Sequence, residues 1–267
     1  MYLTANILPH NDDIEEFEEF VKDIKNYGFD AVLVADLGLF DMMQELAPEI
    51  PIHVSTQANN INYRSAIKWY KMGATRVVLA REMSFKEIAE FQKKIPEDLE
   101  LEAFIHGAMC ISYSGRCLLS NYMTGRDSNM GACAHPCRWN YKLVEETRPG
   151  EYMDVFENER GTFIFNSKDL CTIRHIPELV QSGIASLKIE GRVKTSYYVA
   201  TVVGAYRREI DRYCADPENY VFNEAEYEEL ARSVTDRIQQ VFISASRMKI
   251  HRFTRQVRIS EITTLSV

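Results

Sequence analysis

Four cysteines lie close together in the middle of this 267-residue sequence, in the stretch HGAMCISYSGRCLLSNYMTGRDSNMGACAHPCRW. They are Cys110, Cys117, Cys133 and Cys137, spaced C-x6-C-x15-C-x3-C, and Cys171 follows after a further 33 residues. Thiolate sulfur is both a nucleophile and a soft ligand for zinc and iron. The spacing therefore indicates a metal site, an iron–sulfur cluster, a catalytic thiol or a group of buried thiols.

Features outside this group of cysteines argue against disulfide bonds. The opening MYLTANILPHNDDIEEF has no basic start followed by a long apolar run, and no later segment offers about eighteen uncharged apolar residues. Neither export nor a membrane partner is indicated, so we expect a cytoplasmic chain, and thiols in that compartment stay reduced. The sixth cysteine, Cys214, stands alone on a predicted helix and is expected to be a core residue.

The spacing also bears on the kind of metal. Structural zinc sites generally use C-x2-4-C pairs, and only Cys133 and Cys137 come close to that spacing. An iron–sulfur cluster can take thiolates from separated positions of a long loop. We favour the cluster, while zinc and catalytic or merely buried thiols stay open as alternatives. The nearby Arg116, Arg126 and Arg138 would favour thiolates electrostatically.

Polar side chains also follow the ends of the predicted strands. They are Asn6, Asp36, Thr56, Gln57, Arg81, Glu82, His106, Glu190 and Arg192. Each alone has a simpler role, such as a helix cap, a solvated charge or a histidine satisfied by the backbone. Together they predict a concave polar site, in which Arg81 or Arg192 would hold a carboxylate or phosphate through paired hydrogen bonds.

The elements that must position these residues are visible as a repeat. Apolar segments of strand length lie at 3–8, 30–36, 52–57, 76–81, 99–107 and 186–191. Amphipathic helical patterns lie at 14–28, 62–73, 84–95, 169–183 and 195–213, with Asn62 and Ser84 as N-caps. Nearly continuous apolar strands that alternate with single helices predict parallel βα units and a TIM-like (β/α) barrel, whose chemistry lies at the carboxyl ends of the strands. We expect an incomplete barrel with about six of the usual eight βα units.

Two segments depart from the repeat. Residues 106–140 form the cysteine loop, and 141–166 predict an inserted hairpin, with strands at YKLVEET and GTFIFN joined by an exposed Pro-Gly turn. We expect one barrel domain over 1–234, a usual size for this fold, and a divergent, disordered tail over 235–267.

Three long motifs carry a resemblance to a known family. The run EAFIHGAMCISYSGRCLLSNYMTGRDSNMGACAHPCRWNY, with NSKDLC at 166–171 and SLKIEGRVKTSYYVATVVGAYR at 186–207, resembles peptidase family U32, the collagenase-like PrtC group, over residues 1 to about 234. It looks most like the branch that acts in 5-hydroxylation of the tRNA wobble uridine. Relatives hydroxylate 23S ribosomal RNA or, without oxygen, an aromatic ring in the ubiquinone pathway. The resemblance implies a cysteine-ligated [4Fe–4S] cluster, prephenate as a small-molecule hydroxyl donor and tRNA as a partner.

The resemblance also implies roles for individual residues. By position in the motifs, Cys110, Cys117 and Cys133 match cluster ligands, and the fourth ligand is Cys171 or Cys137. Together with the strand-end analysis, this gives two further sets of candidates. As catalytic residues we expect His106, Glu102 and Glu190, and as substrate-binding residues Asn6, Gln57, Arg81, Arg116, Lys188 and Arg192.

Two other functions stay open. Proteolysis is the first, although the sequence has neither a G-x-S-x-G elbow nor an H-E-x-x-H zinc pair. A cysteine protease would pair a thiol such as Cys110 with His106, which lies four residues earlier, but no third orienting group can be assigned. The second is a noncatalytic partner subunit. The sequence gives no indication of oligomeric state.

The charge balance and the chain ends complete the expectations. The net charge is −8, and residues 237–267 contribute +5, which leaves −13 for the body, so RNA binding by this chain alone should be weak. The resemblance implies that family members begin with two more βα units, which agrees with the six units predicted here out of the usual eight. The tail does not resemble the family, which favours a truncated or frame-shifted gene product over a lineage-specific tail.

Overall fold

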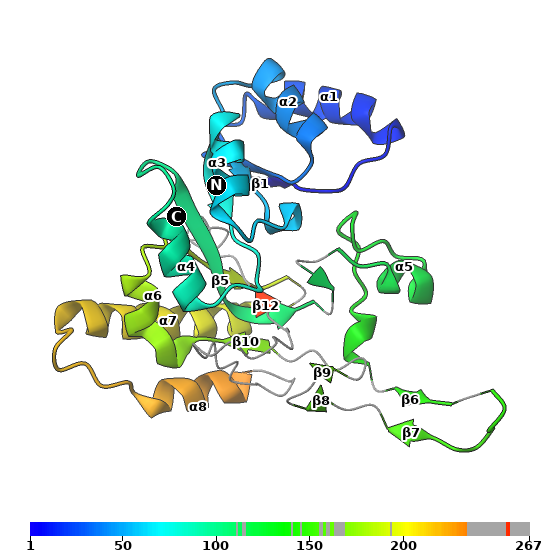
Figure 1. Ribbon diagram of the computed structural model, residues 1–267, viewed down its shortest axis with the longest axis vertical. Helices are drawn as coiled ribbons and strands as arrows, with labels where there is room; N and C mark the ends of the chain where they lie inside the picture. The colour runs from blue at the N-terminus through cyan, green and yellow to red at the C-terminus, as the bar shows by residue number, and fades with distance from the viewer. Residues whose placement is uncertain are drawn as a thin grey trace.

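The computed structural model describes residues 1–110, 112–113, 116–139, 141–144, 146–154, 157–158, 161–162, 169–192, 194–233 and 255–256. Its sheet is built from parallel strands that curl into a half-barrel (Figure 1). These strands are β1 (Tyr2–Ala5), β2 (Ala31–Val34), β3 (Ile52–Val54), β4 (Ala74–Val78) and β5 (Glu100–Met109), paired in chain order, with β11 (Ser186–Glu190) parallel to β5. The predicted incomplete TIM-like barrel with six parallel strands is confirmed.

Helices follow the strands at the positions that the repeat predicts, together with helices at 37–46 and 224–233 that it did not predict. They are α1 (Asp12–Ile24), α2 (Leu37–Leu46), α3 (Tyr63–Lys71), α4 (Phe85–Gln92), α6 (Ile176–Gln181), α7 (Ser196–Ala215) and α8 (Glu224–Ser233), with the 3₁₀ turns η1 (Thr56–Ala58) and η4 (Ile173–His175). The predicted caps are present, since Asn62 accepts a hydrogen bond from Ser65 N and Ser84 forms a capping box with Glu87. Asp36 also proves to be a helix cap, accepting from Gly38 N at 2.8 Å.

The core is divided into two apolar clusters. The first lies between β1–β5 and the helices α1–α4, where α1 buries Phe17, Val21 and Ile24 at helical spacing. The second joins β5 and β11 to α6, α7 and α8, and it contains Ile105 and Ile189. The strands thus form a rigid frame whose carboxyl ends can carry a site.

Two antiparallel strands join the sheet where the sequence predicts none. Strand β10 (Asp169–Cys171) pairs with β5 at the start of a segment that we predicted to be helical from residue 169. The prediction was wrong there because these three residues are held by pairing with the distant residues 106–108, which no local pattern reveals. Strand β12 (Arg255–Gln256) pairs with the end of β5, and the remainder of the predicted tail lies outside the described residues.

The inserted segment also differs from the prediction. Strand β6 (Lys142–Leu143) pairs with β7 (Met153–Asp154), which lies within the predicted turn, and β8 (Glu157–Asn158) pairs with β9 (Gly161–Thr162). Much of the predicted second strand, at 163–166, lies outside the described residues. In Figure 1, β6 and β7 extend away from the half-barrel at the lower right, and the short helix α5 (Leu119–Thr124) lies apart from them at the upper right.

A bulge interrupts the pairing of β5 with β11. Lys188 pairs with Phe104, but the next residue, Ile189, pairs with His106. The extra residue places Ile105 and His106 both on the side of α7, where Ile105 joins the second core cluster and the His106 ring contacts Tyr198 and Tyr206. Among the described helices, none is long and apolar enough to cross a membrane.

Candidate functional site

The cysteine loop lies across the carboxyl ends of the strands and is bonded to them at separate points. Leu8 N donates to Asn129 O (3.3 Å), Asn59 Nδ2 to Tyr113 O (3.3 Å), Arg116 Nε to Gln57 O (2.8 Å) and the Arg192 guanidinium to Gly131 O, while Arg138 pairs with Asp169 at 3.6 Å. These partners follow β1, β3 and β11 or lie on β10. The loop is therefore held against the end of the half-barrel at which βα proteins place their chemistry.

Three of the cysteines share one local arrangement. The sulfur of Cys117 accepts a hydrogen bond from Leu119 N (3.3 Å), and that of Cys133 accepts one from His135 N (3.3 Å). Cys110 Sγ lies 3.1 Å from Ser112 Oγ. In each case the partner is two residues further along the chain. Donors aimed at sulfur stabilise a thiolate, as they do around metal-bound cysteines.

The surroundings of Cys110 favour its thiolate form. Its hydrogen bond with the Cys117 thiol, the nearby Arg81 guanidinium and the contact with Ser112 together lower the pKa of Cys110 to about 5. Because Cys117 supplies that hydrogen bond, its own pKa is raised. Burial raises the pKa of Cys133, and the nearby Cys110 and Cys137 add to the effect. The four cysteines of the loop are thus electrostatic neighbours.

Cys137 and Cys171, the two candidates for a fourth ligand, lie in different surroundings. Cys137 is buried in the 3₁₀ turn η3 (Pro136–Arg138), near Cys133. Cys171 lies on β10 within the second core cluster, and burial raises its pKa to about 11. Cys171 nevertheless receives a backbone hydrogen bond from Ile173, again two residues further on. Proximity therefore favours Cys137, whereas the local arrangement favours Cys171.

The donor set fits a thiolate-bound group in kind. Several sulfurs with N–H or O–H partners and nearby arginines match what an iron–sulfur cluster or zinc requires. Within the described ranges, however, no three His, Cys, Asp or Glu side chains are already arranged closely enough to hold a metal ion. The residues that would hold the group are therefore present as neighbours, without the geometry of a closed coordination shell.

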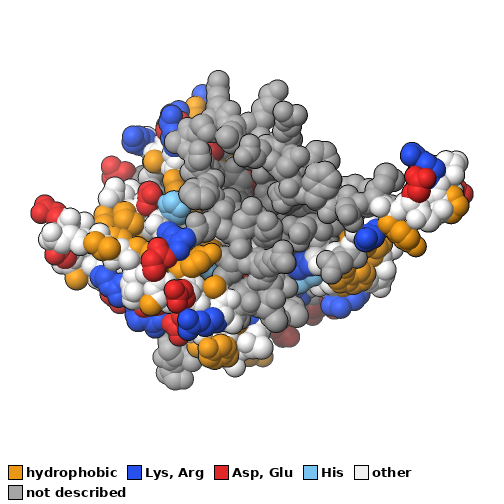
Figure 2. All heavy atoms as spheres, turned by 90° about the horizontal axis from the view of Figure 1, so that it is seen from below, with side chains coloured by type: hydrophobic (Ala, Val, Ile, Leu, Met, Phe, Trp, Pro, Cys, Tyr) orange, Lys and Arg blue, Asp and Glu red, His pale blue; other side chains and the backbone are white. Residues whose placement is uncertain are grey.

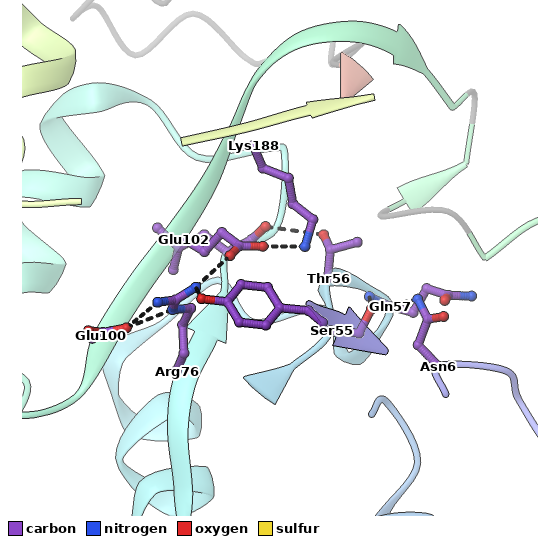
Figure 3. Close-up of polar contacts among 10 residues, drawn as sticks. Asn6, Ser55, Thr56, Gln57, Arg76, Glu100, Glu102 and Lys188 are labelled. Atoms are coloured by element: carbon purple, nitrogen blue, oxygen red, sulfur yellow. Dashed lines mark hydrogen bonds and ion pairs between the residues drawn. The ribbon is translucent and has the colours of Figure 1, made fainter. Parts of the chain in front are cut away.

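Below the loop, the interior of the half-barrel contains a buried ion network (Figure 3). Glu102 lies between Lys188, with which it forms an ion pair, and Arg76, whose Nη1 is 3.2 Å from Glu102 Oε2. Arg76 also pairs with Glu100, its Nε lying 2.7 Å from Glu100 Oε2. Burial opposes ionisation of Glu102, but Lys188 and Arg76 outweigh it and lower the pKa of Glu102 to about 2.

The network leaves Glu102 and Lys188 bound to each other. Both side chains are only 1% exposed. His53 from β3 lies close by, and burial and Arg76 lower its pKa to about 3. The charged groups Arg76, Glu102 and Lys188 tie β4, β5 and β11 together. Their arrangement suits a support for the site above them.

Phe104 lies between this network and the strand ends. Its ring centroid is 5.3 Å from Lys188 Nζ and 5.7 Å from Arg81 Cζ. Arg81 follows β4, and its charge acts on Cys110, Glu190 and Glu82. Arg81 is thus the predicted site residue that the structure brings next to the cysteines.

His106 points away from this group. It is fully buried, its Nδ1 lies 3.3 Å from Tyr206 Oη, and burial together with Lys194 lowers its pKa to about 3. Tyr206 also donates to Ile105 O and accepts from Thr172 N, both at 2.9 Å. The bulge in β5 thus gives His106 a place in the packing of α7.

The other predicted site residues hold the rim together. Asn6 Nδ2 donates to Ser55 Oγ at 2.9 Å, beside Gln57 (Figure 3). The backbone carbonyl of Gln57 accepts a hydrogen bond from Arg116 Nε, and the Glu190 carboxylate accepts one from Arg192 N at 2.8 Å. Arg116 and Arg192 are both engaged with backbone carbonyls, so their observed role is to anchor the loop.

Sequence reasoning missed a second buried charge group. Asp169 on β10 is fully buried and lies 3.6 Å from both Arg138 of the loop and Lys194 after β11. The only signal in the sequence is an acidic residue inside NSKDLC, and the predicted helix there concealed its position.

Comparison with known sequences identifies the family of this chain. The sequence model of Peptidase family U32 matches residues 1–252. The chain belongs to peptidase family U32. The predicted resemblance is therefore confirmed, and the match continues beyond residue 234, where we expected it to end.

Relatives within family U32 include several RNA hydroxylation proteins. The chain is 45% identical over 230 residues to tRNA hydroxylation protein P1 of Bacillus subtilis, covering 86% of this chain and 54% of that protein. It is 41% identical over 249 residues to tRNA hydroxylation protein P of Escherichia coli, covering 79% and 55%. Identity to the 23S rRNA 5-hydroxycytidine synthase of E. coli is 30% over 252 residues, covering 94% and 35%. The chain thus spans about half the length of the first two relatives.

Proposed function

We propose that this chain takes part in oxygen-independent 5-hydroxylation of the tRNA wobble uridine, as a hydroxylase that uses prephenate as the hydroxyl donor. The observation that carries the proposal is the 45% identity, over 86% of the chain, to a protein named for tRNA hydroxylation. It is supported by the cysteine loop, which brings Cys110, Cys117 and Cys133 together at the carboxyl ends of the strands.

We further propose that these three cysteines, with Cys171 or Cys137, hold a [4Fe–4S] cluster. When bound, such a group would supply electron-transfer chemistry beside the donor. The protein's own part is to keep the thiolates hydrogen-bonded, to supply the positive charge of Arg81 next to Cys110, and to fix the loop through Arg116 and Arg192. The Glu102–Lys188 pair stiffens the strands underneath.

Binding of tRNA by this chain alone should be weak. The net charge is −8, and an acidic surface repels the phosphate backbone. On the face shown in Figure 2, acidic and basic side chains are interspersed over the described residues, and no continuous basic surface is seen there. Cytoplasmic location is part of the same proposal, since tRNA is modified in that compartment.

The test is to purify the chain without oxygen and measure iron and sulfide. We expect a brown protein, loss of iron on Cys117→Ser, and no loss on Cys214→Ser. The prediction that Cys214 is a core residue was wrong, since this cysteine is exposed on α7, outside the loop. Cys171→Ser and Cys137→Ser then identify the fourth ligand. Stoichiometric zinc without iron would overturn the cluster, and unchanged iron in Cys117→Ser would overturn its ligand set.

A second measurement addresses the reaction. The chain is expressed in a strain that lacks its own tRNA hydroxylation proteins, and 5-hydroxyuridine is measured in the tRNA. Restoration that depends on Cys117 and on prephenate synthesis would support a catalytic chain. Restoration only with a second protein would support the partner-subunit alternative.

Proteolysis, suggested by the family name, finds no specific support in the described residues. A thiol protease needs a histidine in hydrogen-bond contact with its cysteine. The ring of His106 is hydrogen-bonded to Tyr206, and Cys110 contacts Cys117 and Ser112. The nucleophile and base that the sequence allowed are therefore not paired.

A further inference from the structure

Arg81 differs from the other arginines around the site. Arg116 and Arg192 donate to backbone carbonyls, and Arg76 pairs with two glutamates. The Arg81 guanidinium, by contrast, makes no hydrogen bond or ion pair to any residue that the structure describes, although its Nε is closed off from solvent. Its Cζ lies 5.7 Å from the centroid of the Phe104 ring, and the buried Nε–H is left without a protein partner.

A second buried polar group without a partner lies beside it. Asn60 is fully buried, and neither its Nδ2 nor its Oδ1 has a hydrogen-bond partner among the described residues. Its backbone carbonyl accepts from Ala80 N at 2.9 Å, the residue directly before Arg81. Next along the chain, Asn59 donates to Tyr113 of the cysteine loop but leaves its Oδ1 unpaired. Three neighbouring residues thus carry unsatisfied polar atoms where β4 meets the loop.

Such a group of atoms indicates a missing polar ligand. Buried donors and acceptors without partners are rare in folded proteins because each loses its hydrogen bonds to water. A guanidinium is satisfied best by a planar anion that accepts two parallel hydrogen bonds, and a carboxamide by a group with both a donor and an acceptor. A small organic acid with a carboxylate and a hydroxyl or carbonyl group offers both.

The surroundings restrict where this ligand can lie. The cavity on the α4 and α6 side of Arg81 has a volume of about 30 Å³ and is lined mainly by apolar side chains such as Ile88, Leu170 and Leu179. That space is sufficient for one or two water molecules and no more. The Arg81 side chain is half-buried, and Cys110 and Glu190 lie within reach of its charge, so a larger ligand would have to approach Arg81 from the side of the cysteine loop.

We propose that Arg81 and Asn60 form the polar end of a binding pocket for a small organic carboxylate, held between β4 and the cysteine loop, with Arg81 as the residue that binds the carboxylate. The assignment rests on the proposed function in one respect, namely that the carboxylate belongs to the hydroxyl donor. Of the two arginines that the sequence offers as carboxylate clamps, Arg81 receives the ligand and Arg192 anchors the loop.

Binding of prephenate to the anaerobically prepared chain is the direct test, measured by titration calorimetry on wild type and on Arg81→Gln, Arg81→Lys and Asn60→Ala. We expect Arg81→Gln to weaken binding about 10- to 100-fold, the range for a lost hydrogen bond to a charged group. Arg81→Lys should restore little of it, since an ammonium cannot reproduce the planar fork. Arg207→Gln, which removes an exposed guanidinium paired with Asp211, is the matched control and should bind as wild type does.

Two further readouts distinguish an anion-binding Arg81 from an Arg81 that only supports the fold. Arg81→Lys keeps the positive charge beside Cys110, so its iron content and thermal midpoint should be unchanged although its binding of prephenate is weakened. A loss of iron in Arg81→Lys would instead make Arg81 a support of the cysteine loop. Malonate, a plain dicarboxylate, serves as a second probe. If wild type ignores prephenate but malonate raises its thermal midpoint only when Arg81 is present, the anion site stands and the proposed donor is wrong. If prephenate binds equally well to wild type and Arg81→Gln, the anion site is wrong while the donor stands.

Discussion

Lys188 and Glu102 form a buried ion pair whose loss should lower the free energy of unfolding. Removing one partner of a buried ion pair leaves an uncompensated charge, which typically costs about 3–5 kcal/mol. We expect Lys188→Met to lower the free energy of unfolding by about that amount, measured by urea denaturation followed by tryptophan fluorescence. The double variant Lys188→Met, Glu102→Gln should recover most of the loss, because it removes both charges. Equal losses in the single and double variants would show that packing dominates there.

His53 gives a prediction about pH. Its pKa is about 3 in the folded chain against 6.5 for an unperturbed histidine, so the unfolded chain binds the proton more tightly. The stability that neutral His53 contributes is therefore complete above pH 6.5 and is lost as the pH falls from 6.5 towards 3, by up to about 1.4 kcal/mol per pH unit. We expect His53→Phe, which keeps the edge-to-face contact with Tyr2, to lack this part of the dependence. Parallel stability curves for the two proteins over that range would contradict it.

At the scale of elements, the cysteine loop depends on a few side chains that bond to its backbone. Arg116 of the loop donates a hydrogen bond to the Gln57 carbonyl, and Arg192 donates one to the Gly131 carbonyl of the loop. Gly131 adopts a positive φ of 80° beside the Arg192 guanidinium. We expect Arg192→Ala to speed amide hydrogen exchange in peptides covering 116–139 about fivefold, the effect of roughly 1 kcal/mol, and the double variant with Arg116→Ala to add to it. Arg148→Ala, whose exposed ion pair with Glu151 spans 4.0 Å, is the control and should leave the loop unchanged.

The elements also show where prediction from sequence succeeds. Strands and amphipathic helices with a regular period were predicted correctly, because each element shows its buried face in its own sequence. Helix α2 was not singled out, since LGLFDMMQEL is apolar on most sides. Strand β10 was missed because three residues gain their structure only by pairing with β5.

Some features of the candidate site could likewise be predicted from the sequence, and others could not. The residue types and the end of the barrel could be predicted, since parallel strands bring their carboxyl ends together. The direction of His106 could not, because it depends on one extra residue in β5 relative to β11. The Asp169 group and the unpaired amide of Asn60 likewise arise from contacts between distant segments.

For the whole molecule, the edge of the sheet has consequences for association. Within the described residues β1 pairs with β2 alone, so its other edge presents free backbone groups that can pair with another chain. We expect the chain to associate as its concentration rises, and Thr4→Lys, at an exposed position on β1, to reduce this in sedimentation velocity experiments. Asn121→Lys, exposed on α5, adds the same charge outside the sheet and should have little effect. Equal behaviour of both variants would attribute the change to charge alone.

The anchoring of the cysteine loop also determines when, during synthesis of the chain, the loop can take its final arrangement. Its fixing points extend along the chain from Leu8 to Arg192, so the last of them leaves the ribosome 55 residues after Cys137, the last cysteine of the loop. The sulfurs consequently reach their final arrangement only after β11 has joined the sheet. The proposed cluster would thus be inserted into a folded half-barrel, with the cysteine loop lying across one end of it.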